Sequence, residues 1–143
     1  MIRAAVVERD IVAEALAKEV AGPGNGAIAL FIGTVRSSNE GKPVTGIEYS
    51  SYREMAEEEM TTILGEALRS YDFSSAVVEH RVGALEVGEA SIGIAVSSPH
   101  RRAALDALDY IVEEVKRRAP VWKLELYEDG TREWVGAGAA VAK

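Results

Sequence analysis

The sequence contains no cysteine among its 143 residues. This absence excludes disulfide bonds, thiolate metal ligands and a cysteine nucleophile, and it is typical of a reducing compartment. No run of about 18 apolar residues is present, so no membrane-spanning helix is predicted. The N-terminus also lacks the basic and then apolar succession of a secretion signal. We therefore expect a cytoplasmic protein.

Positive charge is scarce as well. Sixteen Lys and Arg residues stand against 23 Asp and Glu residues, so the formal net charge is −7. A field of that sign repels nucleic acids and anionic membranes, and we expect neither as a partner. Apolar residues make up 48% of the chain, which is enough for a buried core, and the length predicts a single domain over residues 1–143.

The positive charge is concentrated in one segment. Residues 100–123 carry six Lys or Arg and four Asp or Glu, a net charge of +2, whereas the rest of the chain carries −9. A basic segment in an acidic protein indicates a local site for an anion.

Hydrophobic periodicity predicts three main helices. Apolar residues recur at helical spacing over residues 11–21, 54–71 and 100–119. Apolar runs predict strands at residues 27–35, 44–51, 73–82, 90–97, 121–127 and 132–135, with an exposed loop at 36–43. Asp10 and Ser98 are the expected N-caps of the first and third helices, with Pro99 at the first helical position. The pattern predicts an α+β fold with a mixed, mainly antiparallel sheet.

The start of the third helix is one candidate anion site. Arg101 and Arg102 oppose the helix dipole there, which a purely structural helix tends to avoid. A bound phosphate or carboxylate would be favoured by both guanidinium groups and by the free backbone N–H groups. The alternative is that both arginines point into water.

Two lysines farther along are candidates for chemistry. On a helical wheel Lys116 lies at the edge of the apolar arc, where an ammonium group can lose part of its hydration and act as an acid, a base or a nucleophile. Arg118 lies inside that arc and either extends its head group to solvent or interacts with the helix dipole. Lys123 follows Pro120 on a strand and either projects back toward Lys116 or is simply solvated.

Several other kinds of site are not supported. His80 and His100 have no carboxylate or third imidazole at ligand spacing, so no metal site is predicted. The glycines at residues 22–26 follow a helix rather than a strand, unlike those of nucleotide-binding loops, and no Gly-x-Ser-x-Gly motif is present. We expect no cofactor.

Six motifs occur in the order found in one known family. They are FIGTVRSSN at residues 31–39 followed by Gly41; Tyr49, Tyr52 and Met55-Ala56; HRVG at 80–83; Gly88-Glu89; SPHR at 98–101; and Lys116 with APVWK at 119–123 and Trp134-Val135. Over almost its whole length the chain thus resembles the large, catalytic subunit of molybdopterin synthase, the MoaE family.

The resemblance implies a sulfurtransferase of molybdenum cofactor biosynthesis with an α/β hammerhead-type fold. Members of this family take sulfur from the C-terminal Gly-Gly thiocarboxylate of a small ubiquitin-like sulfur carrier. They transfer two sulfurs to cyclic pyranopterin monophosphate and so form the dithiolene of molybdopterin. The expected assembly is a homodimer with one small subunit at each end, a heterotetramer. This chain ends in Val-Ala-Lys rather than Gly-Gly, so we expect it to be the sulfur acceptor.

The resemblance also implies roles for five residues. Lys116 and Lys123 match the two active-site lysines, with Lys116 expected to act as an acid, a base or a transient acyl acceptor and Lys123 to assist. Arg36 matches a substrate-binding arginine. His100 and Arg101 match residues that bind the substrate anion and can reach in from the neighbouring protomer.

The resemblance also suggests residues for contacts with the partner. Phe31, Pro120 and Trp122 are candidates for binding the partner's tail or lining the pocket. Many relatives have a Glu shortly before the second tyrosine of the second motif, where this chain has two serines, at residues 50–51.

Two other functions fit the same residues. A non-catalytic adaptor would bind a ubiquitin-like tail or a phosphorylated ligand through the basic patch. Such an adaptor would tolerate Arg in place of Lys116, whereas proton transfer or acyl acceptance would not. A phosphate-handling enzyme of unrelated chemistry is less favoured, because no metal ligands are evident.

Overall fold

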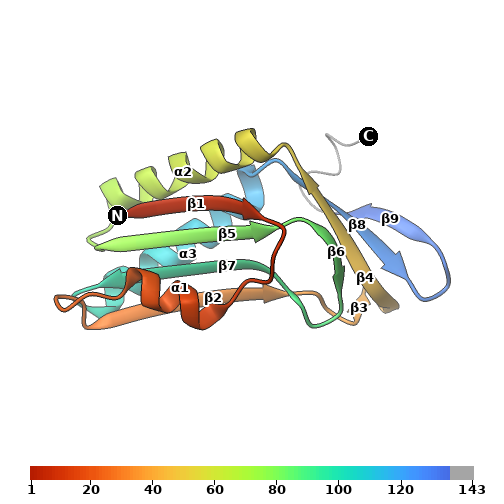
Figure 1. The fold of residues 1–143 in the computed structure, drawn as a ribbon, viewed down its shortest axis with the longest axis horizontal. Coiled ribbons are helices and arrows are strands. Elements are labelled where there is room, and N and C mark those ends of the chain that lie inside the picture. Colours follow the sequence, from red (N-terminus) through yellow and green to blue (C-terminus); the bar gives the residue numbers. More distant parts are fainter. Residues whose placement is uncertain (136–143) are drawn as a thin grey trace.

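In the computed structural model, residues 1–135 form three helices and nine strands (Figure 1). The helices are α1 (Ala13–Val20), α2 (Arg53–Ser70) and α3 (Arg101–Arg118). The strands are β1 (Ile2–Val7), β2 (Ala27–Thr34), β3 (Ser38–Asn39), β4 (Lys42–Ser51), β5 (Ser75–Arg81), β6 (Gly83–Glu86), β7 (Ala90–Ser98), β8 (Val121–Tyr127) and β9 (Arg132–Val135). The C-terminal sequence that is not Gly-Gly lies outside the described residues.

The first sheet has four strands in the order β1-β5-β7-β2. β1 runs parallel to β5, whereas β5 and β2 are both antiparallel to β7. The prediction of an α+β fold with a mixed, mainly antiparallel sheet and three main helices is therefore confirmed. β1 was not predicted, because its sequence IRAAVV does not alternate between apolar and polar residues.

The second sheet has the order β3-β4-β8-β9, with β6 also paired to β4. It lies at one end of the first sheet, as Figure 1 shows. The expected loop at 36–43 instead contains β3, which folds back on β4 through a turn at Glu40 and Gly41. Both turn residues have positive φ angles, 50° and 81°, a conformation for which glycine is favoured. β6 fills the region between two expected turns at Gly83 and Gly88.

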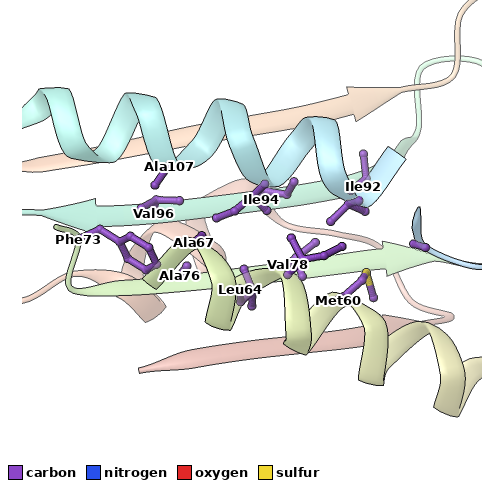
Figure 2. Packing of buried hydrophobic residues seen from close by; sticks show 14 of the residues in the cluster. Met60, Leu64, Ala67, Phe73, Ala76, Val78, Ile92, Ile94, Val96 and Ala107 are labelled. Carbon is purple, nitrogen blue, oxygen red and sulfur yellow. The ribbon is translucent and has the colours of Figure 1, made fainter. Parts of the chain in front are cut away.

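The helices cover both faces of the first sheet. α1 packs Leu16 and Val20 against Val77 and Ala95 on one face. α2 and α3 cover the opposite face, where the main core is formed (Figure 2). The helices within residues 1–135 include none that is long and apolar enough to cross a membrane.

Both predicted N-caps are wrong. α3 begins at Arg101 with His100 as its N-cap, because Ser98 still pairs with Ala27 in the sheet. α1 has Val12 as its N-cap, and Asp10 instead accepts a hydrogen bond from Arg81 at 2.9 Å. Sheet pairing and an ion pair have overridden the local capping preference at these two positions.

An ion-pair network joins α2 to α3. The Arg118 guanidinium donates to Glu59 at 2.8 Å, to Glu66 at 2.6 Å and to Glu114 at 3.1 Å. Tyr110 donates a further hydrogen bond to Glu66 at 2.9 Å. The hydrogen bond from Arg118, followed by that from Tyr110, lowers the pKa of Glu66 to about 2. Arg118 therefore holds the two helices together rather than simply reaching solvent.

Two methionines of α2 provide a matched test of the core. Met60 is fully buried, whereas Met55 is 57% exposed on the same helix. We expect Met60→Ala to lower the free energy of unfolding by about 2–5 kcal/mol, because it leaves a cavity. Met55→Ala should change it by less than about 0.5 kcal/mol. Urea denaturation measures both, and equal losses would contradict the packing.

The network at Arg118 predicts that the stability of the folded protein depends on pH. The folded-state pKa of Glu66 lies below its ordinary value, so its stabilising contribution is present above about pH 4.5 and is lost as the pH falls toward 2. In Arg118→Gln, the melting temperature should fall less steeply over that interval than in the wild type. Arg102→Gln is the control, since Arg102 on the same helix pairs with Asp106, which lies outside the network. Identical slopes in all three proteins would show that the network contributes nothing.

Candidate functional site

A cavity of about 650 Å³ lies between the two sheets. One wall is formed by the end of the first sheet at which β2 and β5 finish and β7 begins. The last turn of α3 forms another wall, and β4, β8 and β9 of the second sheet close the far side. The cavity is thus built from segments that are far apart in the sequence.

Three cations line this cavity. Arg36 follows the end of β2, Lys116 lies in the last turn of α3, and Lys123 lies in β8. The Lys116 Nζ atom is 5.5 Å from the centre of the Phe31 ring, a distance compatible with a cation–π contact. Arg36 and Lys116 are exposed and Lys123 is half-buried, so the expected partial burial of Lys116 is not seen in a single chain.

A bend at Pro120 brings the two lysines to one cavity. Proline cannot continue a helix, and α3 ends at Arg118 just before it. The chain then enters β8, which pairs with β4 so that Lys123 lies opposite Tyr49. Lys123 therefore projects toward the same cavity as Lys116, which agrees with the first of the two alternatives that the sequence left open.

The other two residues predicted to bind the substrate lie far from the cavity within one chain. His100 and Arg101 are exposed at the N-terminal end of α3. At about 1.5 Å per helical residue, the backbone of Arg101 is roughly 22 Å from that of Lys116. Within one chain, neither residue lines the cavity.

The three candidates for contacts with the partner's tail lie around the cavity rather than in its wall. Phe31 contacts Lys116 as described, and Pro120 is half-buried at the bend. Trp122 lies on the opposite face of β8 from Lys123 and packs edge-on against Tyr52, with their ring centres 4.9 Å apart. Its indole N–H is buried without a hydrogen-bond partner among the described residues.

Sequence reasoning missed an imidazole in the wall. His80, at the end of β5, was considered as a metal ligand and as part of the HRVG motif but not as a site residue, yet it lines the cavity and is 8% exposed. Its ring packs edge-on against Tyr49 with the ring centres 5.3 Å apart. Burial, together with the nearby charge of Lys123, lowers the pKa of His80 to about 4. The imidazole is therefore neutral at physiological pH.

A buried carboxyl group was also missed. Glu125 is 5% exposed on β8, and one of its oxygens has no hydrogen-bond partner among the described residues. Burial raises its pKa, while the positive charges of Lys123 and Arg36 act in the opposite direction. Strand alternation placed Glu125 on the same face as Lys123, so the sequence did contain a signal for it.

The site is suited to binding an anion without a metal ion. Among residues 1–135, no three His, Asp or Glu side chains are grouped so that they could hold a metal. The three cations would attract phosphate and carboxylate groups, and the surrounding chain is acidic overall. The neutral imidazole of His80 in the wall adds hydrogen-bonding atoms that carry no positive charge.

Comparison with known proteins places this arrangement in a family. The family model described as MoaE protein matches residues 6–118. The chain belongs to the MoaE family. Its relatives include proteins named molybdopterin synthase catalytic subunit.

Individual MoaE relatives match most of the chain. The catalytic subunit from Bacillus subtilis is 41% identical over 136 residues, covering 95% of this chain and 86% of its own length. That from Thermoplasma volcanium is 40% identical, covering 90% of this chain and 94% of its own. The crystal structure of molybdopterin synthase from Staphylococcus aureus superposes with a TM-score of 0.88 at 32% identity, covering 92% of this chain and 96% of that one.

The low pKa of His80 predicts a dependence of stability on pH. The folded-state pKa of about 4 lies below the ordinary value of 6.5, so only the unfolded chain takes up this proton between those pH values. The free energy of unfolding should therefore fall by up to about 3 kcal/mol as the pH drops from 6.5 to 4. His80→Phe should lack this component, whereas His100→Phe, which changes the exposed histidine, should retain it. Denaturant titrations at several pH values measure the slope, and a wild-type slope in His80→Phe would contradict the assignment.

Proposed function

We propose that this MoaE-family chain is the catalytic subunit of a molybdopterin synthase. It would transfer sulfur from the C-terminal thiocarboxylate of a small ubiquitin-like partner to cyclic pyranopterin monophosphate. The observation that carries the proposal is the convergence of Lys116, Lys123 and Arg36 on one cavity in a chain of net charge −7. The names of its relatives, which describe a catalytic subunit, support both the activity and the presence of a second subunit.

A cationic cavity fits both reactants. The cyclic phosphate and the thiocarboxylate are each anionic, so they repel one another in solution. Lysine and arginine side chains on a rigid frame offset that repulsion and hold the two groups in contact. The cavity volume of about 650 Å³ is within the usual range for a small-molecule site.

The chemistry replaces oxygen by sulfur at two neighbouring carbons of the substrate. For each replacement, the thiocarboxylate sulfur bonds to a carbon, the carbon–oxygen bond there breaks, and water hydrolyses the acyl–sulfur bond. The partner's tail then leaves as a carboxylate, without net oxidation or reduction. Lys116 would donate and accept the protons of these steps or accept the acyl group transiently, with Lys123 assisting. Arg36 would hold the phosphate.

A second copy of the chain would complete the site. His100 and Arg101 are exposed at the end of α3 that is remote from their own cavity. In a symmetric dimer they would reach the neighbouring cavity and bind the substrate anion there. One small subunit on each copy would give the heterotetramer, with the partner's tail passing near Phe31, Pro120 and Trp122. The absence of cysteine fits a cytoplasmic location.

Substitutions at Lys116 test the proposal. The purified protein is mixed with a thiocarboxylated small subunit and cyclic pyranopterin monophosphate, and the dithiolene product is followed by mass spectrometry. We expect Lys116→Ala and Lys116→Arg each to lower the rate at least about 100-fold, because an arginine cannot exchange a proton or accept an acyl group at neutral pH. Arg117→Ala, next in the chain and paired with Glu114, should keep the wild-type rate.

The pattern of losses separates the possible functions. Full activity of Lys116→Ala would contradict the catalytic role of that residue. Loss in Lys116→Ala with full activity in Lys116→Arg would mean that only the charge is needed. If the wild type forms no dithiolene under conditions in which an authentic synthase does, the chain is a binding module and the proposed activity is wrong.

A further inference from the structure

The imidazole of His80 is held in one tautomer. Its Nδ1 atom lies 3.0 Å from the backbone oxygen of Arg81. A carbonyl oxygen only accepts hydrogen bonds, so Nδ1 must carry the proton. The neutral ring therefore has an unprotonated Nε2 atom with a free lone pair. This atom makes no hydrogen bond to residues 1–135, and the ring lines the cavity.

The neighbours of His80 hold the ring in place. Tyr49 packs against it edge-on, with an angle of 64° between the ring planes. Tyr49 is in turn paired across the strands with Lys123, and both residues line the same cavity, as does Ser91, whose hydroxyl donates to the backbone oxygen of Gly33 at 3.3 Å. Burial raises the pKa of Tyr49, so its hydroxyl group also stays neutral. One part of the cavity wall is thus made of two uncharged polar rings.

The charges facing His80 keep it neutral. Lys123 of β8 is the ionised side chain that acts on it, and it disfavours a second positive charge on the ring. Tyr49 of β4 and Ser91 of β7 are uncharged, and β5 itself contributes the carbonyl of Arg81. Burial acts in the same direction as Lys123, so Nε2 is an acceptor at physiological pH.

The chemistry of a suitable ligand follows from this combination. An anionic group would be repelled by the Nε2 lone pair and would bind the cations instead. A cationic group would be repelled by Lys116, Lys123 and Arg36. A neutral N–H donor fits, provided that it belongs to a molecule whose anionic part lies against the cations. A phosphorylated heterocycle with ring N–H groups has both features.

We propose that His80 is a specificity-determining residue whose Nε2 atom accepts a hydrogen bond from a ring N–H group of the pterin. This assignment rests on the proposed function and adds to it, because it separates recognition of the heterocycle from recognition of the phosphate. The phosphate binds the cations, and the heterocycle lies against the wall formed by His80 and Tyr49. Neither residue takes part in bond breaking.

A spectroscopic experiment on the wild type tests the acceptor directly. In protein with ¹⁵N-labelled histidine, His80 should show a protonated Nδ1 and an unprotonated Nε2 at pH 7. His80→Gln identifies its signals, since only two histidines are present. Addition of cyclic pyranopterin monophosphate should shift the Nε2 signal in the direction of hydrogen-bond acceptance and leave Nδ1 nearly unchanged. Inorganic phosphate at the same concentration should not shift it.

Affinities of variants provide the second test. By isothermal titration calorimetry, His80→Phe should bind cyclic pyranopterin monophosphate about tenfold more weakly than the wild type, because it lacks the acceptor. His80→Gln places an amide oxygen near the position of Nε2 and should recover most of that loss. All three proteins should bind inorganic phosphate equally, since phosphate contacts only the cations.

These experiments test the role of His80 and the proposed sulfur transfer separately. Equal pterin affinities in the three proteins, a protonated Nε2, or an Nε2 signal that does not move would overturn the role of His80, even if the wild type forms dithiolene normally. Conversely, pterin binding that depends on His80 without dithiolene formation would support this subsite and overturn the proposed sulfur transfer. If His80→Phe does not fold, His80→Gln and the wild-type spectra still give the answer.

Discussion

The direction change at Pro120 is the constraint on which the site depends. α3 is fixed to the first sheet by its buried face and to α2 by Arg118, so the position of its last turn is set by the core. Proline then ends the helix, and the next seven residues form β8 in the other sheet. Lys116 and Lys123 lie on the two sides of this bend. A longer connection would leave their relative position free, and a continuous helix would carry Lys123 away from the cavity.

The location of the protein's positive charge depends on which Lys and Arg side chains form ion pairs with carboxylates. Arg117 and Arg118 in the basic segment form ion pairs with carboxylates, so the local excess of positive charge is not spread evenly over that surface. Lys116, Lys123 and Arg36 instead face a shared cavity. An acidic exterior with a small cationic cavity disfavours large polyanions and still admits a small anion. The paired arginines contribute to the fold, and the three cavity cations contribute to binding.

The elements predicted most closely from the sequence were those with long periodic patterns. α2, α3 and β8 were predicted within one or two residues because each buries one face along its length. β1, β3 and β6 were not predicted, because their own sequences show no alternation of apolar and polar residues and their pairing depends on distant partner strands. The expected N-cap at Ser98 failed for the same reason, since its pairing with Ala27 in the sheet competes with capping.

The sequence by itself determined the residue types of the site: two lysines around a proline, an arginine after a buried strand, and no cysteine that could carry sulfur. Only the tertiary structure decided which of these meet. It brings Arg36 to the lysines and leaves His100 and Arg101 at the far end of α3, because a helix of eighteen residues separates its two ends. It also decided that His80 and Glu125 are buried beside the cations. Burial and neighbouring charge set the protonation of these groups, and both depend on strands that are distant in the sequence.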